Sequence, residues 1–131
     1  MMRSPRDPHH ERGQALTEIA LALPILCILM FAIIEYGTMI WQDMELTSAA
    51  RDGARRAVVA RVEPTPAASV EQAALDSLDT VDADDVHVTV QGGWTRGDEV
   101  TVTVTKHHDL DVFGFVVWSG DLRAVSTVVI G

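Results

Sequence analysis

The chain has 131 residues, so it has room for one small domain, and any membrane anchor reduces that room further. Its formal net charge of −9 excludes a nucleic-acid binder, because an acidic surface repels a polyanion and gains nothing from counterion release. The single cysteine, Cys27, excludes an intrachain disulfide and is expected to be a small apolar packing residue.

Residues 1–13 form a polar segment in front of an apolar one. The segment holds three arginines and two prolines: Arg3, Arg6, Arg12, Pro5 and Pro8. Prolines disfavour a continuous helix, so we expect a short non-helical leader peptide here.

Residues 14–41 are apolar apart from Gln14, Thr17, Glu18, Glu35 and Thr38. At a rise of about 1.5 Å per residue, a helix of this length crosses a hydrocarbon core of about 30 Å. A cleavable secretory signal is the competing interpretation, but its apolar core is only about 7–15 residues long. The length therefore favours a transmembrane helix that stays in the lipid bilayer.

The helical pattern continues through residues 42–62, which lack proline and carry small residues at helical spacing. One helix of roughly fifty residues is the simplest prediction. Gly53 costs about 1 kcal/mol relative to alanine inside a helix. Either a close neighbour requires this glycine, or it is tolerated on an exposed face, and the sequence leaves both interpretations open.

A second, smaller part follows the long helix. Pro64 and Pro66 end the helix, and residues 63–69 are predicted to be a linker. Ser69 and Gln72 have the spacing of a capping box, which predicts a short helix from about Ser69. Its apolar side would carry Val70, Ala74, Leu78 and Val81.

Alternating valines after this helix predict half-buried strands over residues 86–90 and 100–104, joined by a glycine-containing loop at 92–98. A third strand is expected over residues 122–130. The predicted fold class is therefore α+β. One long N-terminal helix precedes a small domain, residues 70–131, in which a short helix packs on an antiparallel sheet of about three strands.

The start of the apolar helix carries an unusual acid, Glu18. A carboxylate inside a bilayer span costs up to about 2.5–3.5 kcal/mol and needs a partner. A cut after Gly13 would create an amino group on Gln14, four residues from Glu18. That amine, from the same or a neighbouring chain, is the partner that the carboxylate lacks.

These residues resemble a known pattern. A basic leader that ends in glycine, a glutamate five residues later and a long apolar helix resemble the substrates of prepilin peptidases, with Gly13 and Glu18 in the matching positions. Three further blocks over about residues 12–58 are similar to TadE-like proteins, a class of minor pilins or pseudopilins: Leu23-Pro24, Ile34-Glu35-Tyr36-Gly37 and the run from Ala49 to Arg55. TadF-like and other pseudopilin subtypes stay open.

The resemblance implies a pilin-like fold and a function. Prepilin peptidase would cut between Gly13 and Gln14, and Glu18 would serve processing and assembly of a tight-adherence (Tad, type IVb, Flp-type) pilus used in adhesion or secretion. Partners would be the peptidase, other pilins and pseudopilins, the Tad inner-membrane assembly platform and the lipid bilayer. The family-like positions on the helix are Pro24, Glu35, Tyr36, Gly37, Arg51, Gly53 and Arg55.

The resemblance also implies a topology in the bacterial cytoplasmic membrane. The chain would cross it once, with a cytoplasmic N-terminus and an extracytoplasmic C-terminal domain, and would go on into the pilus. The chain's own charges support this orientation only in part. The leader arginines favour it, whereas Arg51, Arg55 and Arg56 lie near the opposite end of the span.

The sequence predicts no enzyme, no cofactor and no metal site. His107 and His108 are adjacent, so on a strand they point to opposite faces. The acidic residues between Asp76 and Asp85 lack a calcium-loop pattern and are expected to be solvated. An unprocessed, single-pass, membrane-anchored binding module and a small secreted domain are the alternatives to a pilin-like subunit.

The segment from Val112 to Trp118 is apolar and lies between two aspartates. It is either core packing, as a layer beneath the sheet or a fourth strand, or a surface lobe that meets a neighbouring subunit or the membrane.

Overall fold

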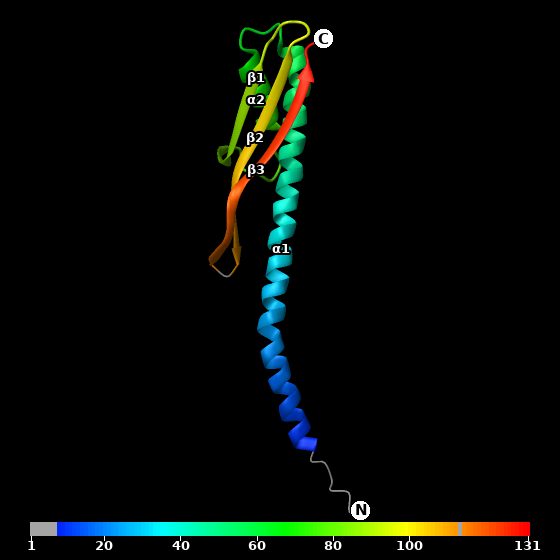
Figure 1. Ribbon diagram of the computed structural model, residues 1–131, viewed down its shortest axis with the longest axis vertical. Coiled ribbons are helices and arrows are strands. Elements are labelled where there is room, and N and C mark those ends of the chain that lie inside the picture. The colour runs from blue at the N-terminus through cyan, green and yellow to red at the C-terminus, as the bar shows by residue number, and fades with distance from the viewer. Residues whose placement is uncertain (1–7, 113) are drawn as a thin grey trace, which may run out of the picture.

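The computed structural model describes residues 8–112 and 114–131 (Figure 1). The described elements are two α-helices, a 3₁₀ turn and three strands: α1 (Pro8–Ala60), α2 (Pro66–Asp76), η1 (Ala83–Asp85), β1 (Val86–Gly92), β2 (Glu99–Val112) and β3 (Phe115–Val129). The predicted α+β class, with a long first helix, a short second one and a three-stranded antiparallel sheet, is confirmed.

The long helix α1 has 53 residues, close to the predicted length. It begins at Pro8, so the expectation of a non-helical leader is wrong for residues 8–13. Proline is favoured in the first turn of a helix, where its missing amide hydrogen costs nothing and its fixed φ angle suits the helix. Arg3, Arg6 and the other residues of the leader before Pro8 lie outside the described residues.

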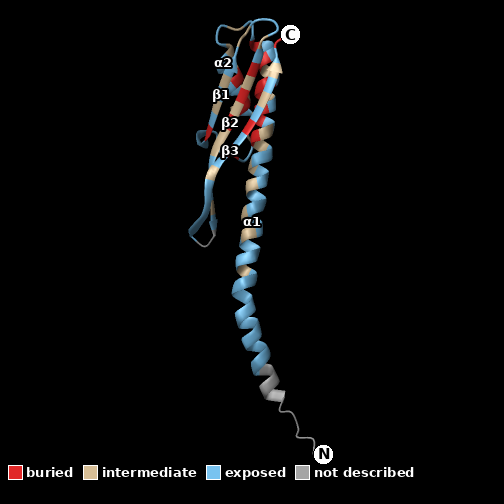
Figure 2. Ribbon diagram, viewed as in Figure 1, coloured by how far each residue is buried: buried red, intermediate tan, exposed pale blue. Residues whose placement is uncertain are grey.

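The C-terminal half of α1 packs against the sheet (Figure 2). Its small residues let the helix and the sheet approach closely, and a Cβ atom on Gly53 would lie 3.2 Å from both Ala74 Cβ and Val102 Cγ1. The interpretation of Gly53 as a close-packing residue is therefore confirmed. The buried hydrophobic residues in the described part of α1 are Leu46, Ala49, Ala50, Ala54, Ala57 and Ala60.

The sheet has the order β1-β2-β3, and both pairs are antiparallel. Val100, Val102 and Val104 of β2 are fully buried, as their alternation predicts, while the threonines between them are partly exposed. α1 packs on β2 and β3, and α2 packs on α1 and β1. The core of the C-terminal domain therefore includes one face of α1, whereas the sequence led us to expect α2 as its cover.

The start of α2 differs from the prediction. The helix begins at Pro66, and its N-cap residue Thr65 makes no side-chain capping bond. Ser69 Oγ instead accepts a hydrogen bond from Arg56 Nε at 2.9 Å, and Gln72 Nε2 donates to Asp76 Oδ1 at 2.7 Å. The predicted capping box is wrong because both side chains bind other partners.

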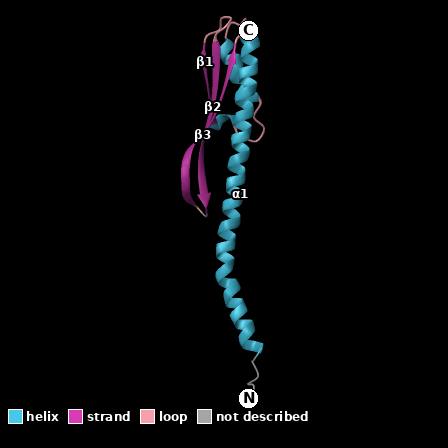
Figure 3. Cartoon of the chain, turned by 45° about the vertical axis from the view of Figure 1, so that its right-hand side comes forward, coloured by secondary structure: helices cyan, strands magenta, loops and turns pink. Residues whose placement is uncertain are grey.

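Strands β2 and β3 form a hairpin that runs past the rest of the domain, alongside α1 and toward its N-terminal half (Figure 3). Its turn contains Gly114, with a φ angle of 80°, and the amide of Gly114 donates to Asp111 Oδ1 at 2.7 Å. Phe115, Val116 and Val117 are all exposed at this end of the hairpin. Phe115–Trp118 belong to β3 and are exposed, so for these residues the interpretation as core packing or as a fourth strand is wrong.

Candidate processing and assembly segment

The predicted cleavage position lies in the second turn of α1. Thr17 Oγ1 donates a hydrogen bond to the carbonyl oxygen of Gly13 at 3.0 Å, and Gln14 Nε2 donates to Glu18 Oε1 at 3.3 Å. Gly13 has open space where a Cβ would be. The four residues Gly13, Gln14, Thr17 and Glu18 are all exposed, so a peptidase can reach them. To cut the chain it must first open these helical turns.

The apolar part of α1 is exposed on all sides. Large side chains such as Leu16, Leu21 and Ile25 are each more than two thirds exposed. The best 18-residue window has a mean hydropathy of 2.5 and none of it is buried. This length and composition are enough to cross a membrane, and a bilayer gives these side chains the apolar surroundings that the chain itself does not provide.

Pro24 lies inside this exposed stretch of α1. Because proline has no amide hydrogen, the carbonyl of Ala20 lacks its usual helical donor. Farther along, Thr38 Oγ1 donates to the carbonyl of Glu35 at 2.7 Å, and Tyr36 is 58% exposed. These residues lie before the part of the helix that packs on the sheet.

Arg51 and Arg55 are exposed on α1, whereas Gly53 faces the core. The neighbouring Arg56 is tied down, because its Nη2 lies 2.6 Å from Glu63 Oε1. Gly13 and Arg51 are 38 residues apart on one helix, a distance of about 57 Å. The predicted site residues therefore do not come together in one pocket, and they form a linear series along α1.

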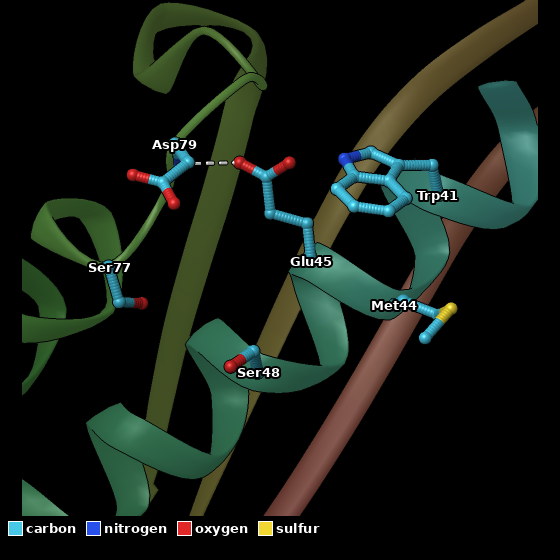
Figure 4. A pocket seen from close by; sticks show the side chains of 6 residues that line it. All are labelled: Trp41, Met44, Glu45, Ser48, Ser77 and Asp79. Atoms are coloured by element: carbon cyan, nitrogen blue, oxygen red, sulfur yellow. Dashed lines mark hydrogen bonds between the residues drawn. The ribbon is translucent and has the colours of Figure 1, made fainter.

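The sequence analysis missed the carboxylate that fixes α1 to the loop after α2. Glu45 Oε1 accepts hydrogen bonds from the backbone amides of Asp79 at 2.5 Å, Thr80 at 2.7 Å and Val81 at 3.0 Å. Its Oε2 also accepts a bond from Thr80 Oγ1. Figure 4 shows the side chain reaching from α1 toward Asp79, beside the indole of Trp41.

These bonds stabilise the charged form of Glu45. Burial raises the pKa of its carboxyl, but the side-chain bond from Thr80 and the three backbone bonds together outweigh that effect and lower the pKa to about 2. The pocket next to it, about 250 Å³ in volume, is shallow and lined by Trp41, Met44, Glu45, Ser48, Ser77 and Asp79. We assign Glu45 to tertiary packing, since its oxygens already have partners.

The paired histidines behave differently from each other. His108 is buried, whereas His107 is exposed, with Nδ1 2.8 Å from Asp121 Oδ1 and Nε2 3.2 Å from both Asp109 Oδ1 and Ser119 Oγ. The bond to Asp121 is the main reason why the pKa of His107 is raised. This cluster links β2 to β3 at the base of the extended hairpin.

Residues 13–55 match the model of a family described as TadE-like protein. Over this segment the chain is TadE-like. The match includes the predicted site residues from Gly13 to Arg55 and covers the exposed apolar helix with the first packed turns of its extension. No curated protein and no solved structure matches the chain significantly.

The TadE-like segment coincides with a helix that is long and apolar enough to cross a membrane. The sheet and α2 lie outside the matched residues.

Proposed function

We propose that this TadE-like chain is a minor pilin or pseudopilin subunit of a tight-adherence pilus system. A prepilin peptidase removes residues 1–13, and the mature chain begins at Gln14. The chain joins other pilins and pseudopilins at the inner-membrane assembly platform and contributes to adhesion or secretion.

One observation carries this proposal: a single helix lies in two different surroundings. The apolar part of its first half is largely exposed, and its second half packs against the sheet. A subunit that is held in a bilayer and later packs its helix among those of other subunits needs this arrangement. The TadE-like match over residues 13–55 supports it independently.

In the proposed topology, the leader is cytoplasmic and the sheet domain is extracytoplasmic. Loss of residues 1–13 removes three arginines and two acids, which changes the formal net charge from −9 to −10. The new amine at Gln14 is then close to the carboxylate of Glu18, whose contact with the Gln14 side chain supports this approach. We assign Glu18 to subunit assembly through this pair.

The experiment that tests the proposal compares two glycine variants in cells that make an active prepilin peptidase. Gly13 and Gly37 both lie on α1 and both have open space where a Cβ would be. Gly13→Val should block processing and leave membrane insertion intact, whereas Gly37→Val should be processed like the wild type.

A Cβ atom at either position has no neighbouring atom within 4 Å, and valine is introduced on the same helix in both variants. A difference between the two variants therefore reports recognition by the peptidase and not misfolding. The products are separated by intact-mass spectrometry after detergent extraction. Full-length wild-type chain in cells with active peptidase would contradict the proposal and support the unprocessed membrane-anchored module. A cut at a different position would support a secreted domain.

A further inference from the structure

The far end of the β2–β3 hairpin carries an exposed apolar surface, here called the hairpin tip and defined as Phe115–Trp118. The exposed fractions are 76% for Phe115, 58% for Val116, 66% for Val117 and 42% for Trp118. Four consecutive apolar residues with this exposure are unusual on a surface that faces water only, and such surfaces mark contacts.

The hairpin tip lies at the level of the apolar half of α1. Gly53 and Val102 pack side by side, and from there β2 runs toward the N-terminal end of α1. The ten residues from Val102 to Val112 extend about 33 Å at 3.3 Å per residue, the length of about 22 helical residues. The tip therefore lies near the level of residues 31–35 of α1. The range extends to residue 35 because an inclined strand covers less length along the helix axis.

The same level is the expected outer boundary of the hydrocarbon core. A core of about 30 Å takes about 20 helical residues, which from Gln14 end at Ile33. Glu35 is the next charged residue on the helix. The hairpin tip and the end of the apolar span thus meet the bilayer at about the same depth.

Polarity along the hairpin changes sharply at this depth. The polar cluster of His107, Asp109, Ser119 and Asp121 lies immediately before the tip. Trp118 pairs with Leu110 across the hairpin and is an aromatic residue of the kind enriched at membrane interfaces. A polar band followed by an apolar, aromatic end is the pattern of a segment that enters a bilayer from water.

Asp111 limits how deep the tip can go. Its carboxylate accepts the amide hydrogen of Gly114 and so belongs to the turn. Insertion of a carboxylate is costly at the centre of a bilayer and much less costly near the headgroups. An interfacial position, about 5–10 Å into the boundary between headgroups and acyl chains, satisfies both the apolar tip and this carboxylate.

We propose that the hairpin tip is a second membrane contact, which inserts Phe115–Trp118 into the outer-leaflet interface next to α1. The two contacts together fix the tilt and rotation of the sheet domain on the bilayer. The proposal requires only that α1 spans the membrane, and it holds whether or not the leader is removed.

The test uses full-length chains with a single tryptophan, reconstituted at low protein density in phosphatidylcholine vesicles. Trp118 is retained in a Trp41→Phe, Trp94→Phe variant, and Trp94, in the β1–β2 loop at the opposite end of the domain, is retained in the matched control. Bromine atoms on the acyl chains quench tryptophans that touch them. We expect at least twofold quenching of Trp118 and none of Trp94.

Two valine variants in the Trp118-only background sharpen the result. Val117→Glu adds a charge at the tip and should remove most of the quenching, whereas Val125→Glu, at a similarly exposed position higher on β3, should leave it unchanged. Resistance to alkaline extraction shows for each variant that α1 is inserted, so loss of the span and loss of the tip contact are distinguishable.

Equal, unquenched emission from Trp118 and Trp94 in inserted protein would overturn the proposal. So would protection of Trp118 from aqueous acrylamide without bromine quenching, because that result would assign the tip to a second copy of the chain.

Discussion

The bond network of Glu45 predicts a measurable loss when its charge is removed. Glu45→Gln keeps the size of the side chain and one acceptor oxygen, but the amides of Asp79, Thr80 and Val81 lose a charged acceptor. A pKa lowered from 4.5 to about 2 corresponds to about 3.4 kcal/mol as an upper limit. Because Glu45 is partly exposed, solvent screening reduces this figure to about 1–2 kcal/mol.

The pH dependence follows from the direction of the shift. The folded-state pKa is lowered, so the stabilisation is present above pH 4.5 and is lost as the pH falls from there toward 2. In the Gln variant this contribution is absent at every pH, so the difference between the wild type and the variant should shrink as the pH falls through this window.

The assay is amide hydrogen exchange of the full-length chain in detergent, read at residues 79–81. A loss of 1–2 kcal/mol speeds exchange of these amides about 5- to 30-fold at pH 7. Asp43→Asn, which removes an exposed carboxylate two residues away on α1, is the control and should change nothing there. Equal exchange in the wild type and Glu45→Gln at pH 7 would refute the reasoning.

Three further predictions concern α1 and the hairpin. Gly53→Leu should destabilise the domain by about 1–3 kcal/mol in thermal unfolding, because a Cβ atom there already lies 3.2 Å from two side chains. Gly37→Leu is the control and should not destabilise the domain. The Glu18→Gln variant should be inserted and cut normally but should form fewer crosslinks to other pilin subunits. Normal crosslinking would contradict the assembly role and leave Glu18 with a role in recognition by the peptidase only. The raised pKa of His107 means that its stabilising contribution is complete below about pH 6.5 and is lost as the pH rises through the folded-state value, so His107→Asn should flatten that part of the stability profile.

The parts of the fold that could be predicted are those in which local patterns and tertiary packing agree. Val100, Val102 and Val104 alternate because one face of β2 is buried, and the small residues around Gly53 reflect the close approach of α1 to the sheet. The apolar span could be read directly from its length. The predicted site residues all lie on α1, so the prediction of one continuous helix also gave their order along it.

The features that could not be predicted depend on partners far away in the sequence. Glu45 binds backbone amides 34 to 36 residues later, and backbone donors leave no mark in the sequence. Ser69 had the spacing of a helix cap, but Arg56 binds its hydroxyl, and Pro66 starts the helix one turn earlier. The exposed hairpin tip has the same apolar composition as a buried core strand. Only its position beyond the rest of the domain distinguishes it from such a strand.

The most direct test of the proposed function is the N-terminus of the wild-type chain, measured by intact-mass spectrometry in membranes with and without an active prepilin peptidase. The proposal predicts a chain that begins at Gln14 when the peptidase is active and at the original N-terminus when it is not. A chain that retains residues 1–13 under both conditions would contradict it.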